Sequence, residues 1–220
     1  RLRHRRPLAA PVLQPPLSTL TLRFFEDTMQ KKAINECNLF FFDCETGGLD
    51  PNVASMIEVA CVVTDPTGEN VIHEYCAKVK PLKPVHPTAA AINGYTPEVW
   101  DKEAVDSVTA MAKLMAYSRN SVFIAHNVAF DWAFFEQEMK RLAYRWQGDY
   151  HKVDTVALAW PFYSSMRVPN VKLVTLREFF GIETGDAHRA LADVHACRQL
   201  YLKLMGLYNG AIHHAYSSQA

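Results

Sequence analysis

The sequence predicts an α/β fold in which helices flank a mixed central sheet, and three observations carry that prediction. Apolar runs of strand length recur, two of them are joined by a turn, and helical patterns alternate with strands further along the chain. A hairpin requires antiparallel pairing, whereas strand–helix alternation is typical of parallel pairing. The chain has 220 residues, 49% of them hydrophobic, which is enough for one well-buried domain.

The first half of the chain supplies three of the predicted strands. "LFFFD" (39–43) has the composition of a buried strand, "MIEVACVVT" (56–64) is mostly apolar, and "VIHEYCAKVK" (71–80) alternates as a half-exposed strand should. The "DPTG" segment (65–68) has turn chemistry, so the last two strands should form an antiparallel hairpin.

Helices and two further strands are predicted after the hairpin. In chain order they are short helical pieces over 85–100, a helix over 103–118, a strand over 121–126, an amphipathic helix over 130–144, a strand or helix entry at 153–163, a short helix over 172–182 and a long helix over 189–206.

Composition predicts where the domain lies. Residues 1–28 are rich in Arg and Pro and show no sustained period, so we expect a disordered or non-native extension. Their four prolines argue against the amphipathic helix of an organelle presequence. The folded domain is predicted over 29–210, with a short tail over 211–220.

Charge and cysteine usage restrict the function classes. The formal net charge is zero, and beyond residue 28 the chain has 18 basic and 21 acidic residues. A protein that coats long nucleic acid carries a broad basic excess, so any such contact here should be a local grip on an end. No apolar run approaches the roughly 18–20 residues that cross a bilayer, so no membrane is expected. Five cysteines without a C-x-x-C pair predict reduced thiols and a cytoplasmic location.

Four acids are predicted to converge at one edge of the sheet. Asp43 and Glu45 end the first strand on one face, where adjacent carboxylates repel unless a cation lies between them; a solvated strand end is the alternative. Asp131 follows a central strand that should end at the same edge, although the helix dipole also favours an acid there. Asp193 lies on the apolar face of the last helix, where a lone acid is costly unless paired or metal-bound.

His188 precedes Asp193 by five residues. Within one regular helix the two side chains would point roughly 140° apart, so His188 should lie on the preceding loop or at the helix entrance. An imidazole with a pKa of about 6.5 is suited to deprotonating a water near neutral pH.

These residues resemble the motifs of the histidine-containing branch of the DEDD superfamily of 3′→5′ exonucleases, the DnaQ-like group. "FDCETGGLDPNVASMIEVA" is similar to D-x-E-T with a downstream I-E-x-A, "AHNVAFD" to H-N-x-x-F-D, and "HRALADV" to H-x-x-x-x-D. The group includes the proofreading epsilon subunit of bacterial polymerases, RNase T and the three-prime repair exonucleases. The resemblance spans residues 39–205.

The resemblance implies an RNase H-like exonuclease fold with a five-stranded mixed sheet. It implies that Asp43, Glu45, Asp131 and Asp193 are the ligands of two divalent metal ions, Mg²⁺ or Mn²⁺, and that His188 is the general base. Two hard cations roughly 3.5–4 Å apart can activate a water and stabilise the leaving oxygen of a phosphodiester.

Six residues are implied to contact the 3′ end: Thr46, Gly48, Leu49, Ile92, Asn93 and Asn127. Leu49 and Ile92 would wedge against the terminal bases, with core packing as the alternative, and Asn127 also has the chemistry of an N-cap. Many relatives have E-T-T-G where this chain has Gly47, and His-Gly where it has Asn93 and Gly94.

Several other polar residues have two interpretations each. Glu58 is either a partner of the metal ligands or a paired edge acid, and Asp154 is more typical of a helix cap than of a ligand. Arg167 and Lys172 either touch phosphates or lie on a solvated loop. His195 and Asp186 compete with His188 and Asp193 by proximity, although the spacing of the third motif favours His188 and Asp193.

The predicted function is a metal-dependent 3′→5′ exonuclease that releases nucleoside 5′-monophosphates, with DNA favoured. An exoribonuclease of the RNase T or oligoribonuclease kind shares all five catalytic residues, and an inactive nucleic-acid-binding module on the same fold is the remote alternative. Expected partners are single-stranded or frayed 3′ ends of DNA or RNA, and a polymerase or other repair protein. The chain is expected to be a monomer or a homodimer.

Overall fold

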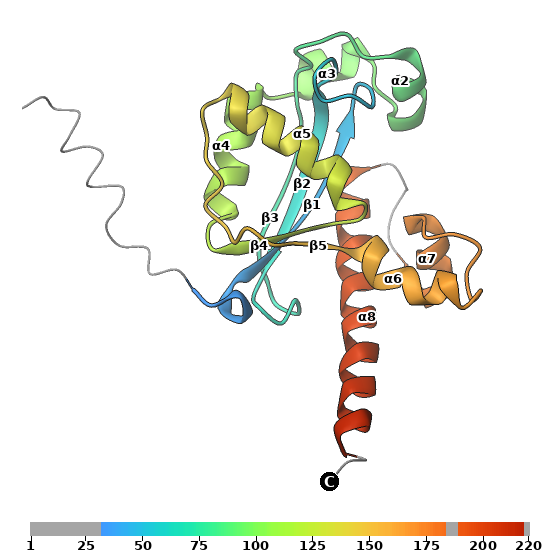
Figure 1. Ribbon diagram of the computed structural model, residues 1–220. Helices are drawn as coiled ribbons and strands as arrows, with labels where there is room; N and C mark the ends of the chain where they lie inside the picture. The colour runs from blue at the N-terminus through green and yellow to red at the C-terminus, as the bar shows by residue number, and fades with distance from the viewer. Residues whose placement is uncertain (1–31, 184–188, 218–220) are drawn as a thin grey trace, which may run out of the picture. The chain divides into compact units, whose positions relative to one another are not determined.

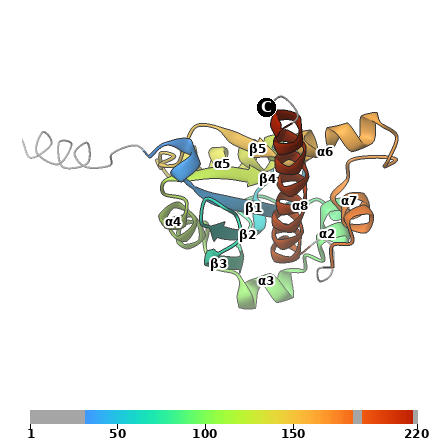
Figure 2. The ribbon, with the colours of Figure 1, turned by 90° about the horizontal axis from the view of Figure 1, so that it is seen from below.

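The computed structural model describes residues 32–183 and 189–217. The predictions for residues 1–28, Asp186 and His188 lie outside these residues. The described part contains a five-stranded sheet in the order β3-β2-β1-β4-β5, and Figure 2 shows the strands in this order from β5 at the top to β3 at the bottom. Its strands are β1 (Asn38–Thr46), β2 (Met56–Thr64), β3 (Val71–Lys78), β4 (Ser121–Ala125) and β5 (Lys152–Asp154).

The sheet is mixed, as the sequence predicts. Strand β2 pairs antiparallel with both β1 and β3, whereas β4 pairs parallel with β1 and β5. The Gly68 N–H donates to the carbonyl of Asp65 at 3.0 Å and closes the predicted hairpin turn between β2 and β3. Because β1 and β4 are parallel and adjacent, their carboxyl ends lie at the same edge of the sheet.

Helices cover both faces of the sheet (Figure 1), with α4 and α5 on one side and α8 on the other. The helical elements are η1 (Ile34–Glu36), α2 (Pro87–Asn93), α3 (Pro97–Glu103), α4 (Ser107–Tyr117), α5 (Val128–Arg141), α6 (Thr155–Ser164), α7 (Leu173–Phe180) and α8 (Ala190–Ser217).

Helix α8 is longer than its hydrophobic pattern predicts. The pattern ends near residue 206, whereas the helix continues to Ser217. Leu204 is the last fully buried residue of α8, and Leu207 and Ile212 are exposed. The apolar stripe therefore stops where the helix leaves the core, while the backbone hydrogen bonds continue beyond it.

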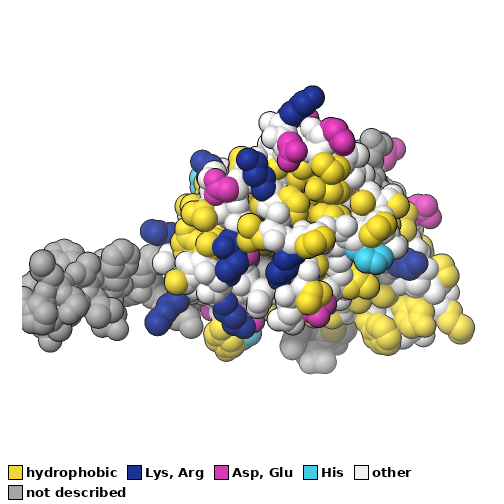
Figure 3. All heavy atoms as spheres, turned by 90° about the horizontal axis from the view of Figure 1, so that it is seen from above, with side chains coloured by type: hydrophobic (Ala, Val, Ile, Leu, Met, Phe, Trp, Pro, Cys, Tyr) yellow, Lys and Arg dark blue, Asp and Glu magenta, His cyan; other side chains and the backbone are white. Residues whose placement is uncertain are grey.

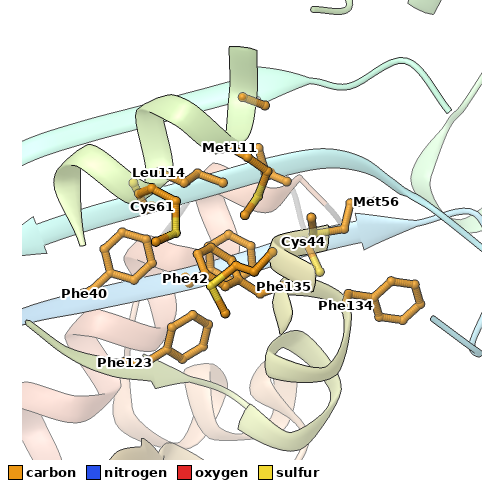
Figure 4. Close-up of a cluster of buried hydrophobic side chains, with 14 of the residues drawn as sticks. Phe40, Phe42, Cys44, Met56, Cys61, Met111, Leu114, Phe123, Phe134 and Phe135 are labelled. Carbon is orange, nitrogen blue, oxygen red and sulfur yellow. The ribbon is translucent and has the colours of Figure 1, made fainter. Parts of the chain in front are cut away.

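The side chains of β1 alternate between two cores. Phe40 and Phe42 belong to a cluster between the sheet and the α4 and α5 helices, where Phe42 packs edge-on against Phe135 at 5.2 Å between ring centres (Figure 4). Phe41 points to the opposite face, against Tyr201 of α8. All three phenylalanines are fully buried, so β1 is fixed on both faces.

All five cysteines are free, as the lack of a C-x-x-C pair predicts. Among the described residues, no helix combines the length and the apolar content needed to span a bilayer.

Candidate active site

Three of the predicted metal ligands lie together at the carboxyl end of β1. Asp43 and Glu45 come from β1 and Asp193 from the first turn of α8, and one carboxylate oxygen of each lies within 4.8 Å of the others. They meet because β1 presents residues two apart on one face and α8 packs against that face. We refer to Asp43, Glu45, Asp193 and Asp131 as the acidic edge.

Asp131 joins this edge from the opposite side of the sheet. It lies in the first turn of α5, is 3% exposed, and its Oδ1 accepts a hydrogen bond from the backbone N–H of Cys44 at 3.2 Å. Cys44 lies between Asp43 and Glu45, so its backbone N–H holds Asp131 beside these two acids. Asp131 is close enough to raise the pKa of Asp43 by its charge.

Burial and mutual repulsion dominate the electrostatics of the acidic edge. Burial raises the pKa of the Asp43 carboxyl well above its usual value, and the charges of Asp131, Asp193 and Glu45 raise it further. Burial also raises the pKa of Asp131 to about 8. A bound cation would relieve both penalties, and an all-oxygen donor set suits a hard cation such as Mg²⁺ or Mn²⁺. The residues present therefore fit the metals that the resemblance implies.

Two arginines flank the acidic edge. Nη1 of Arg177, on α7, lies 3.9 Å from Oδ1 of Asp193, and Nε of Arg189 lies 3.8 Å from Oε1 of Glu58. Glu58 is 2% exposed and lies opposite Glu45 on β2, and its Oε2 has no hydrogen-bond partner among the described residues. The interpretation of Glu58 as a paired edge acid is right about the pairing and wrong about the edge, because β2 lies between β3 and β1. No local pattern in the sequence singles out Arg177, because its contact with Asp193 depends on how α7 docks on α8.

A groove of about 850 Å³ opens beside Glu45. Five of the six predicted substrate contacts line it: Thr46, Gly48, Leu49, Ile92 and Asn93. Leu49 is 86% exposed and Ile92 is 56% exposed, so neither packs in the core. Hydrophobic side chains also gather on the face seen from above in Figure 3. A mostly apolar groove with a few polar groups is typical of a ligand site.

Hydrogen bonds within the chain shape the floor of this groove. Asn93 is buried, and its side-chain amide donates to the carbonyl of Thr46 at 3.1 Å while its Oδ1 accepts from the Tyr95 N–H. The Thr46 hydroxyl donates to the carbonyl of Gly48 at 2.7 Å. The Asn93 and Thr46 side chains thus hold the loop, which leaves the backbone and the apolar side chains to face a ligand.

Gly47 lies against the segment that follows β3. Its N–H donates to the Ser55 carbonyl and its own carbonyl accepts from the His86 N–H, both at 2.8 Å. A Cβ added at Gly47 would lie 3.4 Å from the Cα of Val85. The two walls of the groove therefore meet at Gly47 through backbone hydrogen bonds, with just enough room for a Cβ.

Asn127 is the predicted contact that the structure does not bring into the groove. It occupies the N-cap position of α5, as predicted, with a φ of 71°, and its side chain makes no capping hydrogen bond. The Asn127 N–H donates to Oδ1 of Asp154 at 3.0 Å. The same oxygen caps α6 by accepting from the Val156 N–H, as the cap interpretation of Asp154 predicts.

His126 completes this hydrogen-bonded region. Its Nδ1 lies 2.8 Å from the Thr155 hydroxyl and its Nε2 lies 2.9 Å from the Val171 carbonyl. Burial lowers the pKa of His126, which keeps the ring neutral. We refer to His126, Asn127, Asp154 and Thr155 as the β4–α6 junction.

The remaining sequence candidates lie elsewhere. His195 pairs with Glu74 of β3 at 2.9 Å. Arg167 lines a separate cavity together with Phe162 and Phe179.

The fold and the acidic edge define an α/β domain whose carboxylate cluster is suited to hold a cation and lies beside an open groove. Comparison with known families is consistent with this, since residues 40–201 match a family model described as exonuclease, RNase_T. The match covers most of the chain. The chain therefore belongs to this exonuclease family, a class of nuclease hydrolases.

Curated relatives include proteins of the DNA polymerase III type. The chain is 29% identical over 165 residues to the PolC-type DNA polymerase III of Thermotoga maritima, covering 74% of this chain and 11% of that protein. It is 26% identical over 175 residues to the DNA polymerase III epsilon subunit of Treponema pallidum, covering 79% of this chain and 76% of that protein. The chain thus spans only a small part of the PolC relatives.

Solved structures confirm the predicted RNase H-like fold. E. coli Exonuclease I in complex with a dT13 oligonucleotide superposes with a TM-score of 0.72 at 22% identity, covering 82% of this chain and 43% of that one. The zinc-bound E. coli Exonuclease I complex with single-stranded DNA gives a TM-score of 0.67 at 24% identity, covering 74% and 39%.

Proposed function

We propose that the chain removes nucleotides from the 3′ end of a nucleic acid, with DNA preferred, by hydrolysing the terminal phosphodiester bond and releasing nucleoside 5′-monophosphates. The observation that carries this proposal is the meeting of three carboxylates within 4.8 Å, one of which, Glu45, also lines an open groove. A groove that adjoins such a site suits a chain terminus whose last phosphodiester lies beside the acids.

The acidic edge is proposed to hold two divalent cations. Asp43, Glu45 and Asp193 would be the ligands that their geometry brings together, and Asp131 would be the fourth. When bound, two Mg²⁺ or Mn²⁺ ions supply Lewis-acid stabilisation of the charge that develops on the phosphate and the leaving oxygen.

The chain's own residues would bind and orient the terminus. The exposed side chains of Leu49 and Ile92 offer apolar surface to the terminal bases, and the loop held by Asn93 presents the backbone around Thr46 and Gly48. From its place in the motif, His188 is proposed to take the proton from the attacking water. A fixed base of this kind contributes about 10²–10⁴-fold in rate.

Two observations support DNA as the preferred substrate. Curated relatives are a DNA polymerase III of the PolC type and an epsilon subunit of DNA polymerase III. A structural neighbour was solved with a dT13 oligonucleotide. By the same relationship we propose that a polymerase is a partner of this chain.

Degradation of labelled oligonucleotides tests the proposal. Single-stranded DNA and RNA of one sequence, each labelled at the 5′ end, are incubated with the protein and Mg²⁺ or Mn²⁺. A ladder that shortens from the 3′ end, with nucleoside 5′-monophosphates as product and DNA degraded faster, is expected. Faster degradation of RNA would favour the exoribonuclease alternative. Absence of mononucleotides from every 3′ end would contradict an exonuclease.

A further inference from the structure

We propose that Arg177 weakens the binding of divalent cations at the acidic edge, by holding a fixed positive charge beside Asp193. This inference rests on the proposed metal site. It adds a residue that none of the three exonuclease motifs contains.

The backbone of Arg177 is fixed on both sides. Leu176 is fully buried in the cluster between α6, α7 and α8, and Ile182 of the same cluster is 5% exposed. The Ile182 N–H donates to the Arg177 carbonyl at 2.8 Å, at the point where α7 ends. The Arg177 side chain therefore starts from an anchored position.

The guanidinium of Arg177 is directed at the acidic edge. Its Nη1 lies 3.9 Å from Oδ1 of Asp193, and the side chains of these two residues are only 14% and 16% exposed. Asp193 in turn has a carboxylate oxygen within 4.8 Å of oxygens from Asp43 and Glu45. A cation at this cluster would therefore lie near the guanidinium, with little water between them to screen the repulsion.

The sign of the effect follows from the charges. Before a metal binds, Arg177 offsets part of the repulsion among the acids, which stabilises the metal-free protein. When a divalent cation binds Asp193, the favourable interaction between Arg177 and the acids is partly lost. The guanidinium also repels the bound cation. A single neighbouring charge shifts the proton affinity of a carboxyl by about 1–3 pKa units, so we expect at least about a tenfold effect on cation affinity.

Titration of Mn²⁺ into the full chain without nucleic acid tests this directly, with free Mn²⁺ measured by electron paramagnetic resonance. Arg177→Gln is expected to bind Mn²⁺ about tenfold more tightly than the wild type. Arg177→Met, which preserves apolar packing next to Leu176, should show the same gain if the Gln variant folds poorly. Arg177→Lys keeps the charge and should remain close to the wild type.

Arg198→Gln is the matched control. It also removes one positive charge, in this case from α8. Arg198 donates to the carbonyls of Gly68 and Glu69 at the hairpin turn, away from the acids. Its Mn²⁺ affinity should equal that of the wild type.

Three results would overturn the proposal. Weaker or unchanged Mn²⁺ binding in both Arg177→Gln and Arg177→Met would make Arg177 a structural support of Asp193. Tighter binding in Arg177→Lys would show that its charge is not the cause. Absence of binding in both the wild type and Arg177→Gln would remove the metal site itself. Because the titration contains no nucleic acid, a failed degradation assay beside a tenfold gain in Mn²⁺ affinity would contradict the proposed function alone.

Discussion

Two polar regions lie side by side where β1 and β4 end. In one the polar groups repel one another, and in the other they are joined by hydrogen bonds. The acidic edge gathers like charges whose burial and repulsion raise the pKa of Asp43. The β4–α6 junction joins its polar groups by hydrogen bonds, as Asp154 accepts from two backbone N–H groups and His126 bridges Thr155 and Val171. The junction stabilises the fold, whereas the acidic edge costs stability until something binds it.

The largest effect is expected from Asp193→Ala. Loss of a proposed metal ligand should abolish detectable hydrolysis, a loss larger than the upper bound of about 10⁴-fold for removing a general base, while circular dichroism shows an intact fold. Asp154→Asn is the matched control from the β4–α6 junction, because its amide oxygen can still accept both N–H groups. Full activity of Asp193→Ala, or an equal loss in Asp154→Asn, would remove the functional difference between the two regions.

His188→Ala should lower the rate by about 10²–10⁴-fold without weakening Mn²⁺ binding. The variant therefore distinguishes metal binding, which we assign to the acids, from proton abstraction, which we assign to His188. Single-turnover rates and a Mn²⁺ titration measure the two properties independently. Wild-type activity of this variant near pH 8 would show that His188 is not the base.

His126→Ala should lower the free energy of unfolding by about 1–3 kcal/mol, because the hydroxyl of Thr155 and the carbonyl of Val171 lose a buried partner. Urea denaturation at pH 8 measures this. A loss of activity in the folded variant larger than severalfold would place His126 in the catalytic machinery instead.

The pH dependence of stability gives a second test of His126. Burial lowers its pKa in the folded state, so the unfolded chain binds the proton more readily. The wild type should therefore lose stability as the pH falls below about 6.5, the pKa of an unperturbed histidine. His126→Gln should show a smaller loss between pH 7 and pH 5, and an equal loss would assign the effect to other groups.

Asp43→Asn should have the opposite effect on stability. Replacing a buried, repelled carboxylate with a neutral amide of the same size should raise the free energy of unfolding of the metal-free protein by about 0.5–2 kcal/mol. The stabilisation that Mn²⁺ confers on the wild type should be lost at the same time. Thermal unfolding with and without Mn²⁺ measures both, and a destabilised metal-free variant would contradict the repulsion.

The smallest effect is expected at Gly47. Its backbone does not need a positive φ and an added Cβ would meet Val85 at 3.4 Å, so Gly47→Ala should change the free energy of unfolding by no more than about 0.5 kcal/mol. Gly94→Ala is the control, because the φ of 71° at Gly94 should make that change cost roughly 1–2 kcal/mol. Equal effects of the two substitutions would contradict this difference.

Local patterns predicted most of the fold. The alternation in β3, the turn at residues 65–68 and the apolar run of β1 each depend on neighbours in sequence, and the mixed sheet followed from them. The predicted end of α8 was wrong because hydrophobic periodicity indicates which residues are buried, and the helix continues after burial ends. The ranges of α5 and α7 differ from the predictions by a few residues at their ends, where periodicity is least informative.

The acidic edge was foreseeable for a specific reason. Acids two apart on a strand share a face, and an acid on an apolar helix stripe is costly, so Asp43, Glu45 and Asp193 each carried a local signal. Asn93 lines the groove as predicted, but its local sequence carried no signal for the hydrogen bond that its amide donates to the Thr46 carbonyl.

By itself, the sequence determined the mixed α/β sheet, the residues that could hold a cation, and the motifs of an exonuclease. Only the tertiary structure decided that Leu49 and Ile92 face a groove, that Asn93 and Gly47 build its walls, and that Arg177 lies beside Asp193. The physical reason is the distance along the chain over which each feature is determined. Side-chain direction within one element follows from its period, whereas contacts between elements depend on how α2, α7 and α8 dock on the sheet.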